Sequence, residues 1–283
     1  MNINWYPGHM KKTADSIRDN LKKVDVVLEL IDARAPRASE NPMIPELIGD
    51  KTRILIFNKG DLADSRENAK WLSHYKKENI VAVSVNSNTG KGINELLDKI
   101  DEVMEQKREK DRSKGIISER VRAMIIGIPN VGKSTLINTL ANRKSAKVGN
   151  MPGITRSNQW IKVEDRLLLL DTPGVLWPKF ESVDLALHLA FIGSIKDEVL
   201  PKEEVALKLV EFLQKNYPEF LVDRYAVEIS DSPLETMENI AKKRGAIMRG
   251  NEIDYTRVTD LILDEFRKGV IGNITLETVD VRN

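Results

Sequence analysis

The sequence contains no cysteine, and it lacks long apolar runs. Without thiols, disulfide frameworks, thiolate zinc sites and cysteine nucleophiles are excluded. No apolar run approaches the roughly 18 residues of a membrane-spanning helix. The first residues have no apolar stretch typical of a signal peptide, and there is no lipidation motif. We therefore expect a cytoplasmic protein that is not attached to a membrane.

An excess of one charge is also lacking, because 44 basic and 43 acidic residues leave a net charge of +1. The distribution is nevertheless uneven. Residues 142–162 hold five basic and no acidic residues, whereas residues 181–240 hold five basic and thirteen acidic ones. A second basic zone follows, made of Lys242, Lys243, Arg244 and Arg249. Charge alone favours solvated faces here, although a polyanion can bind such zones.

The length of 283 residues suggests two domains. Short β-branched runs alternate with amphipathic stretches, which predicts an α/β fold with a doubly wound, mainly parallel sheet. We expect strands at Asp25–Ile31, Arg53–Phe57, Ile80–Val85, Arg122–Ile126, Gln159–Val163 and Leu167–Leu170. We expect helices at Lys11–Lys22, Ser65–Lys77, Ile93–Gln106 and Lys133–Leu140.

The pattern changes after about residue 180, where helical spacing takes over. The segments that show it are Ser182–Leu189, Lys202–Lys215, Glu219–Tyr225, Pro233–Arg244 and Asp254–Arg267. A last strand is expected at Ile274–Val279. We therefore divide the chain into an α/β domain, residues 1–180, and a small all-α domain, residues 181–283. The charged run Lys107–Lys114 is interpreted as a solvated helix end and connector.

The strongest motif is a phosphate-binding loop, the P-loop. Residues 127–134 read Gly-Ile-Pro-Asn-Val-Gly-Lys-Ser, between an expected strand and an expected helix. Its glycines let backbone N–H groups turn towards phosphate oxygens, and the helix N-terminus adds partial positive charge. We expect Lys133 to bridge the β- and γ-phosphates and the Ser134 hydroxyl to bind Mg²⁺.

Two further motifs complete a phosphate and metal site. Asp171-Thr172-Pro173-Gly174 follows an apolar strand, so Asp171 is expected to hold Mg²⁺ through water and the Gly174 N–H to reach the γ-phosphate. Between this motif and the P-loop lies Thr155, in the position of the switch threonine that completes the Mg²⁺ shell.

The guanine base is expected to bind at Asn58-Lys59-Gly60-Asp61, which ends a strand. The Asp61 carboxylate would accept from guanine N1–H and the 2-amino group. Adenine lacks both donors, so this buried acceptor would reject it. Ser84-Val85-Asn86 ends the next strand and resembles the second base-binding element of GTPases, whose backbone N–H meets guanine O6.

The order of these motifs is permuted, because the base motifs precede the P-loop. Joining the former termini through residues 99–120 preserves the site, and the chain opens after Gly174 instead. We infer that the nucleotide state biases the pose of the C-terminal helices, which follow the γ-phosphate loop.

Together these motifs resemble those of the circularly permuted GTPases and, within them, the ribosome biogenesis GTPases that assist assembly of the bacterial large ribosomal subunit. The likeness spans nearly the whole chain. It rests on Trp5–Met10, Asp32–Arg34, Asn41-Pro42, Asn58–Asp61, Gly127–Thr135, Pro152–Thr155, and Asp171–Gly174 with Trp177–Phe180.

This resemblance implies a GTPase that acts in late assembly of the 50S subunit. It would bind 23S rRNA, be stimulated by the subunit and leave after hydrolysis, as a monomer off the ribosome. The resemblance also adds Val131, Gly132 and Thr135 to the GTP-binding residues. The basic cluster Lys242, Lys243, Arg244 and Arg249 is then expected to contact RNA phosphates.

The resemblance implies an unusual hydrolytic group as well. Val175 stands where many GTPases carry glutamine, and it cannot orient water. His9 is the family's candidate to do so, with a surface or docking histidine as the alternative. Asn130 occupies the position of the asparagine in K⁺-activated GTPases; a turn-forming asparagine is the alternative.

Two other functions remain open at this stage. One is a permuted GTPase that serves another RNA particle, such as the small subunit. The other is a GTP-gated binding module whose hydrolysis is incidental. Arg34 and Arg37 either contact RNA or line a solvated loop.

Overall fold

The computed structural model describes residues 10–113, 115, 120–142, 160–172, 174, 176–177 and 182–279. Its strands are β1 (Val26–Asp32), β2 (Thr52–Asn58), β3 (Val81–Val85), β4 (Val121–Gly127), β5 (Trp160–Val163) and β6 (Leu167–Asp171). The helices of the α/β part are α1 (Met10–Leu21), α2 (Pro36–Ser39), α3 (Ile44–Ile48), α4 (Ser65–Lys77), α5 (Ile93–Ser113) and α6 (Lys133–Ala141). They are followed by α7 (Val183–Phe191), a 3₁₀ turn at Asp197–Val199, α8 (Lys202–Asn216), α9 (Pro218–Tyr225), α10 (Pro233–Arg244) and α11 (Tyr255–Arg267).

The six strands form one sheet in the order β3-β2-β1-β4-β6-β5. All neighbouring pairs are parallel except β5 and β6, which are antiparallel. This confirms the expected α/β class and mainly parallel sheet. The chain runs outward from β1 to β3, and α5 then carries it back to β4 on the other side of β1. A topological switch point therefore lies between the carboxyl ends of β1 and β4.

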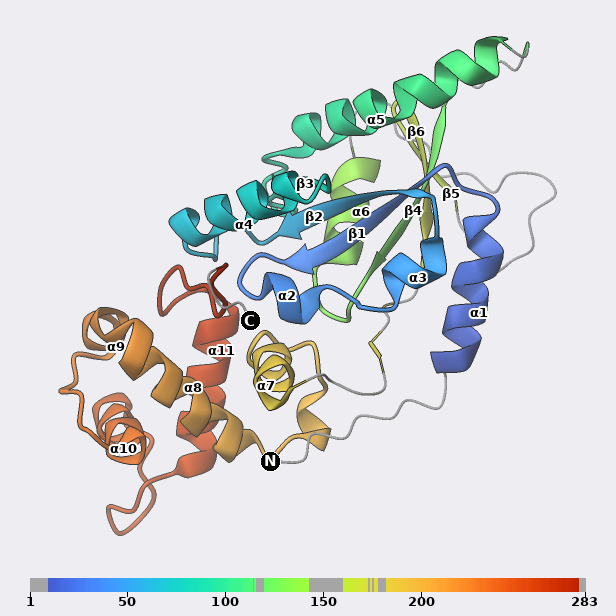
Figure 1. The fold of residues 1–283 in the computed structure, drawn as a ribbon. Coiled ribbons are helices and arrows are strands. Elements are labelled where there is room, and N and C mark those ends of the chain that lie inside the picture. The colour runs from blue at the N-terminus through green and yellow to red at the C-terminus, as the bar shows by residue number, and fades with distance from the viewer. Residues whose placement is uncertain are drawn as a thin grey trace.

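Helices cover both faces of this sheet (Figure 1). Strand residues such as Leu28, Ile54 and Ile125 pack in one core with α5 and α6. Their neighbours in the strands point the other way. Val27 and Met124 meet α1 and α3, and residues of β1 and β2 meet α4. This double burial explains why β1 is buried at all seven positions instead of alternating with polar residues.

The later helices α7–α11 were all expected from their spacing, and each boundary lies within one or two residues of the expected one. Their apolar faces, including Leu209, Ile240 and Ile262, belong to the same continuous core as α5 and α6. Helix α5 extends past the expected end at Gln106 to Ser113, and Arg108 and Arg112 in the added turns pair with Glu105 before them. Among the described helices, none is long and apolar enough to cross a membrane.

The expected strand at Ile274–Val279 is wrong. Within the part of the chain that the structure describes, this segment pairs with no strand, because it lies against the loops that follow β1 and β2. The Ile274 N–H donates to the carbonyl of Leu62, and the Leu276 N–H donates to the carbonyl of Arg34 (3.0 and 2.7 Å). The short helices α2 and α3 were missed, since four or five residues are too few to show a helical period.

A buried ion pair joins the α/β part to the later helices. Asp32 and Arg34 are each about 1% exposed, and the guanidinium donates twice to the carboxylate (2.9 and 2.8 Å). The remaining Arg34 nitrogen donates to the carbonyls of Phe266 and Arg267 at the end of α11 (3.2 Å each). Burial by itself would raise the pKa of Asp32, but the charges of Arg34 and Lys59 outweigh burial and hold that pKa well below its ordinary value. With 1% of its side chain exposed, Arg34 is not an RNA contact.

Replacing Arg34 by an apolar side chain of similar length tests this contact between the α/β part and the later helices. We expect Arg34→Met to lower the free energy of unfolding by about 3 kcal/mol or more, because it leaves a buried carboxylate short of a partner. The measurement is urea denaturation. Arg37→Met, at an exposed arginine on α2, is the control and should change stability by less than about 0.5 kcal/mol. Equal stability of the two variants would contradict this reading.

Candidate nucleotide site

The predicted motifs meet at one edge of the sheet. Asn58 ends β2, Gly127 ends β4 and Asp171 ends β6. These three strands are parallel, so their carboxyl ends lie together beside the switch point. In Figure 1 the β1 and β2 arrowheads point towards the helical part, which places this edge next to α7 and α11.

A cavity of about 490 Å³ opens at this edge. It brings together the first base motif, the loop after β3, the P-loop and the end of α11. The described residues that line it are Asn58, Lys59, Asp61, Leu62, Asn86, Ser87, Asn88, Asn130, Gly132, Thr135, Arg267 and Lys268. Its size suits a small organic ligand.

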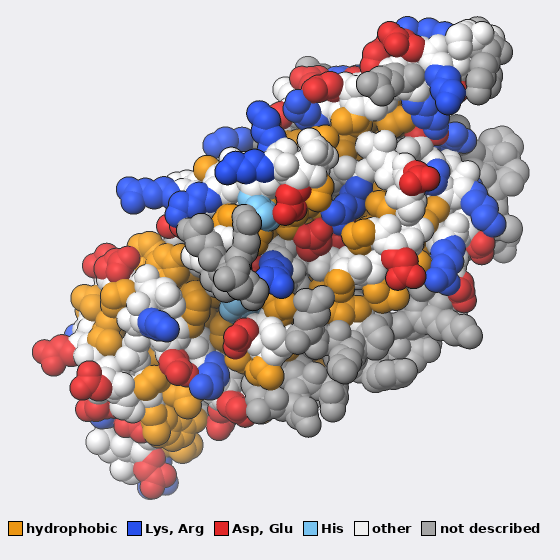
Figure 2. All heavy atoms as spheres, viewed as in Figure 1, with side chains coloured by type: hydrophobic (Ala, Val, Ile, Leu, Met, Phe, Trp, Pro, Cys, Tyr) orange, Lys and Arg blue, Asp and Glu red, His pale blue; other side chains and the backbone are white. Residues whose placement is uncertain are grey.

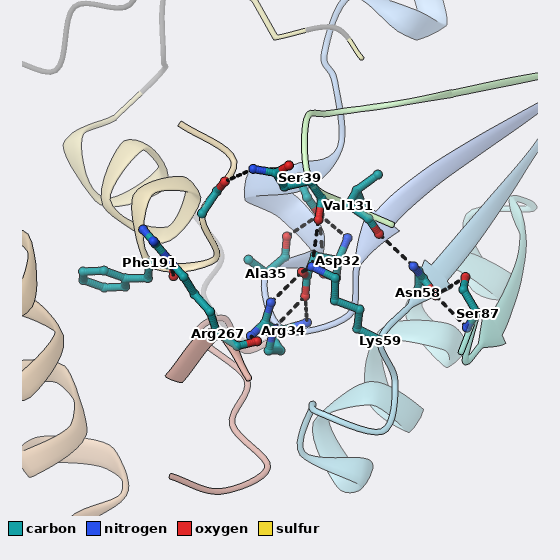
Figure 3. Close-up of polar contacts among 12 residues, drawn as sticks. Asp32, Arg34, Ala35, Ser39, Asn58, Lys59, Ser87, Val131, Phe191 and Arg267 are labelled. Atoms are coloured by element: carbon teal, nitrogen blue, oxygen red, sulfur yellow. Dashed lines mark hydrogen bonds and ion pairs between the residues drawn. The ribbon is translucent and has the colours of Figure 1, made fainter. Parts of the chain in front are cut away.

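Asn58 is the side chain that ties the three loops together. It is 2% exposed; its amide nitrogen donates to the Val131 carbonyl of the P-loop (2.7 Å). Its amide oxygen accepts from the backbone and the hydroxyl of Ser87 (3.2 and 2.7 Å), as Figure 3 shows. Thus Asn58 shapes the cavity from beneath, whereas Asp61 is exposed at its rim. The Asn58 amide nitrogen carries two hydrogens, so its bond to Val131 uses only one of them.

The cavity is lined by the end of the expected second base element, Ser84-Val85-Asn86, and by the two residues that follow it. Val85 is buried, and the hydroxyl of Ser84 accepts from the Asn68 side chain (3.2 Å) below the cavity. Asn86 lines the cavity together with Ser87 and Asn88. Of the expected element, therefore, only Asn86 lines the cavity. Sequence reasoning missed Ser87; the available signal was the pair Gly90 and Gly92 that follows it, both with positive φ.

Lys59 and Asn130 connect the base motif with the P-loop. The Lys59 ammonium donates to the Asp32 carboxylate and to the Asn130 carbonyl (3.0 and 2.9 Å). The Asn130 side-chain amide in turn donates to the carbonyl of Gly193, just after α7 (2.7 Å). The P-loop is thus hydrogen-bonded directly to the helical part.

Lys133 and Asp171 lie side by side at the phosphate end. Lys133 is the first residue of α6 and forms an ion pair with Asp171. Gly174 approaches the P-loop so closely that an added Cβ would lie 3.2 Å from the Pro129 nitrogen. The motif glycine is therefore where a γ-phosphate sensor is expected.

Oxygen donors suitable for Mg²⁺ are present at this end. Ser134 is exposed in the first turn of α6, and Asp171 is 42% exposed at the end of β6. A hydroxyl and a carboxylate are hard ligands of the kind Mg²⁺ prefers alongside phosphates and water. Among the described residues no group of three or more His, Cys, Asp or Glu could hold a metal by itself. These residues therefore fit a metal that enters with a nucleotide.

Some expected residues lie outside the described part of the chain, namely His9, Thr155 and Val175. The basic cluster on the helical part is described. Lys242, Lys243 and Arg249 are exposed. The Arg244 side chain is held within the protein, because it donates to the Arg224 carbonyl (2.8 Å) and stacks over Tyr225.

A parallel sheet with a P-loop at its switch point, and base motifs that precede that loop, define a circularly permuted P-loop GTPase. Two family models match the chain. One, described as RsgA GTPase, matches residues 47–181, and the other, described as 50S ribosome-binding GTPase, matches residues 122–244.

Individual relatives identify the family within this class of GTPases. Ribosome biogenesis GTPase A of Bacillus cereus is 45% identical over 279 residues, which covers 98% of this chain and 94% of that protein. Mitochondrial ribosome-associated GTPase 1 of Mus musculus is 34% identical, covering 96% and 89%. The GNP-bound crystal structure of YlqF from T. maritima superposes with a TM-score of 0.68 at 28% identity, covering 95% and 99%. This chain belongs to the ribosome biogenesis GTPase A family and is a GTPase.

Gly132 offers a direct test of the site. It has φ +96°, and an added Cβ would lie 2.2 Å from the Asn58 amide nitrogen. We expect Gly132→Ala to push Asn58 from the P-loop and to weaken GDP binding by at least tenfold, measured by titration calorimetry.

Gly250→Ala is the matched control, because Gly250 has the same φ and no neighbouring atom within 4 Å of an added Cβ. It should bear only the backbone strain, of about 1 kcal/mol, and bind GDP normally. Equal GDP affinity in the Gly132 variant and the wild type would contradict this account of the site.

Proposed function

We propose that this GTPase acts in late assembly of the large ribosomal subunit, binding its 23S rRNA and leaving after hydrolysis. The observation that carries the proposal is the match of residues 122–244 to the family described as 50S ribosome-binding GTPase. That range includes the P-loop and most of the helical part, up to the basic turn after α10. The proposal places the protein in the cytoplasm, as a monomer when it is off the ribosome.

In this proposal the nucleotide lies along the cavity with its base beside Asp61 and its phosphates over the P-loop. Lys133 leaves Asp171 to bridge the β- and γ-phosphates. Ser134 and Thr155 would bind Mg²⁺ directly and Asp171 through water. The bound Mg²⁺ would supply positive charge to the phosphates as they react.

Hydrolysis in this chain requires a group that orients water, because Val175 has no polar side chain. We assign that role to His9. An imidazole can hydrogen-bond the attacking water near neutral pH. The protein's other work is positioning and charge stabilisation, so the rate depends on how the partner arranges these groups.

Contact with rRNA is proposed for the helical part, residues 181–283, and within it for the basic turn of Lys242, Lys243, Arg244 and Arg249. Three of these side chains are exposed and can reach phosphates. Other regions of the helical part are less suited, because residues 181–240 carry thirteen acidic and five basic residues. Figure 2 shows acidic side chains spread over the helical part on the face in view, while Lys and Arg gather over α4.

Nucleotide state is proposed to bias how the helical part sits on the α/β part. The hydrogen bond from Asn130 to Gly193 supports this, because a P-loop side chain holds the turn after α7. A rearrangement of the P-loop around a phosphate would change that bond.

The test is the rate of GTP hydrolysis with purified large subunits, small subunits or neither. We expect large subunits alone to stimulate turnover strongly, at least tenfold, because they complete the arrangement of the catalytic groups. Stimulation by small subunits instead would assign the protein to assembly of the small subunit. No stimulation by either subunit would favour a GTP-gated binding module whose hydrolysis is incidental.

The His9→Ala variant belongs in the same assay. It should lose most of the stimulated rate while its affinities for GTP and for the large subunit stay within about twofold. His74→Ala is the control, since His74 lies on α4 and pairs with Glu78 away from the nucleotide cavity. Unchanged turnover in the His9 variant would remove His9 from the mechanism.

Potassium dependence is the finer proposal for Asn130. Its amide nitrogen is bonded to Gly193, which leaves the amide oxygen to face a cation beside the phosphates. We expect turnover in KCl to exceed turnover in NaCl several-fold at equal ionic strength, and Asn130→Ala to lose the difference. Equal rates in the two salts would contradict K⁺ activation.

A further inference from the structure

The nucleotide cavity has a wall that none of the nucleotide motifs supplies. Two of its lining residues, Arg267 and Lys268, come from the end of α11 in the helical part. They are separated from the base motif by more than 200 residues of chain, yet they share its cavity.

The end of α11 packs against the loop that follows β2 and carries the first base motif. Gly269, with φ +72°, lies so close to Leu62 that an added Cβ would be 2.6 Å from its side chain. After the turn, the Ile274 N–H donates to the Leu62 carbonyl (3.0 Å), and the Thr275 hydroxyl accepts from the Asp64 N–H (3.1 Å). Leu62 directly follows Asp61, so Lys268 is held at the base end of the cavity.

Three of the described lining residues are cationic, and two of them already bind other groups of the protein. Lys59 is bonded to Asp32 and Asn130. Arg267 forms a two-pronged pair with Asp197 (2.9 and 2.7 Å) and donates to carbonyls at the end of α7. Arg267 thereby positions the end of α11, and four of its five N–H donors are used within the protein.

Lys268 is the cation that can turn to a ligand. Its ammonium pairs with Asp264 one helical turn earlier (2.7 Å), and both side chains are more than half exposed. Such an exposed pair contributes only a few tenths of a kcal/mol, so the lysine can exchange it for a better acceptor at little cost.

We propose that Lys268 is a nucleotide-binding residue, supplied by the helical part, that donates to the ribose–base half of GTP and GDP. This rests on the proposed binding mode, with the base beside Asp61. An ammonium suits the ribose and guanine oxygens as acceptors. Because the contact lies away from the γ-phosphate, it serves the diphosphate and the triphosphate equally.

The test is titration calorimetry of unlabelled GDP and of a non-hydrolysable GTP analogue with the full-length Lys268→Met protein. Methionine keeps most of the apolar stem and removes the charge. We expect both affinities to fall about three- to tenfold, the range for one charge-assisted hydrogen bond at a partly exposed site. Lys268→Arg, which keeps the charge, should restore most of the affinity.

Lys208→Met is the matched control. Lys208 forms a similar exposed pair on α8, with Glu211 (2.7 Å), and does not line the cavity. It should bind both nucleotides as the wild type does. Thermal unfolding of each variant shows whether a loss of affinity is a loss of folding. Unchanged affinities in Lys268→Met, or a loss confined to the triphosphate, would overturn the proposal.

Asp61→Asn separates this inference from the binding mode on which it rests. It should reduce guanine nucleotide binding far more than Lys268→Met does, because it replaces an acceptor of two base hydrogen bonds. If Asp61→Asn binds GDP normally, the base is not where we place it, whatever Lys268 does. If Asp61→Asn fails to bind and Lys268→Met binds normally, the binding mode stands and the role of Lys268 is wrong.

Discussion

The rest of the structure depends on one buried charge, the Asp32 carboxylate at the end of β1. It is neutralised from two sides, by Arg34 and by Lys59, and each cation has a further task (Figure 3). Arg34 binds the last carbonyls of α11, where the helix dipole is negative, and Lys59 binds the P-loop carbonyl of Asn130. A single carboxylate therefore sets the position of a helix end and of a phosphate loop.

The same principle recurs at α7, so that the α/β part and the helical part form one interlocked body. Arg267, on α11, donates to the carbonyls of Ala190 and Phe191 at the end of α7. Asn130 donates to the next turn, at Gly193. Carbonyls at the ends of these helices thus accept hydrogen bonds from side chains near the nucleotide cavity.

Permutation leaves the site intact because a parallel sheet collects its carboxyl ends at one edge, whichever strand comes first. The helix α5 makes the join, crossing from β3 to β4 along the sheet. The opened end of the chain then leads from Gly174 into α7, beside the P-loop. The order of motifs thereby determines that the helical part is attached closest to Gly174.

Sequence patterns alone predicted the six strands, the main helices and the P-loop, because hydrophobic periodicity and glycine spacing are local properties. The GTPase class followed from the resemblance of the motifs to a known family. The sequence could not determine what Arg34 does, since an arginine two residues before a proline in a loop predicts solvent or RNA equally well. Only packing against α11 decided that it is buried. The sequence analysis likewise did not predict that Ser87 lines the cavity or that residues 274–279 form no strand. Both depend on contacts with residues distant in the chain. The presence of Arg267 and Lys268 in the cavity was also decided by tertiary structure, because residues more than 200 positions apart meet only when helix ends and loops satisfy each other's charges and hydrogen bonds.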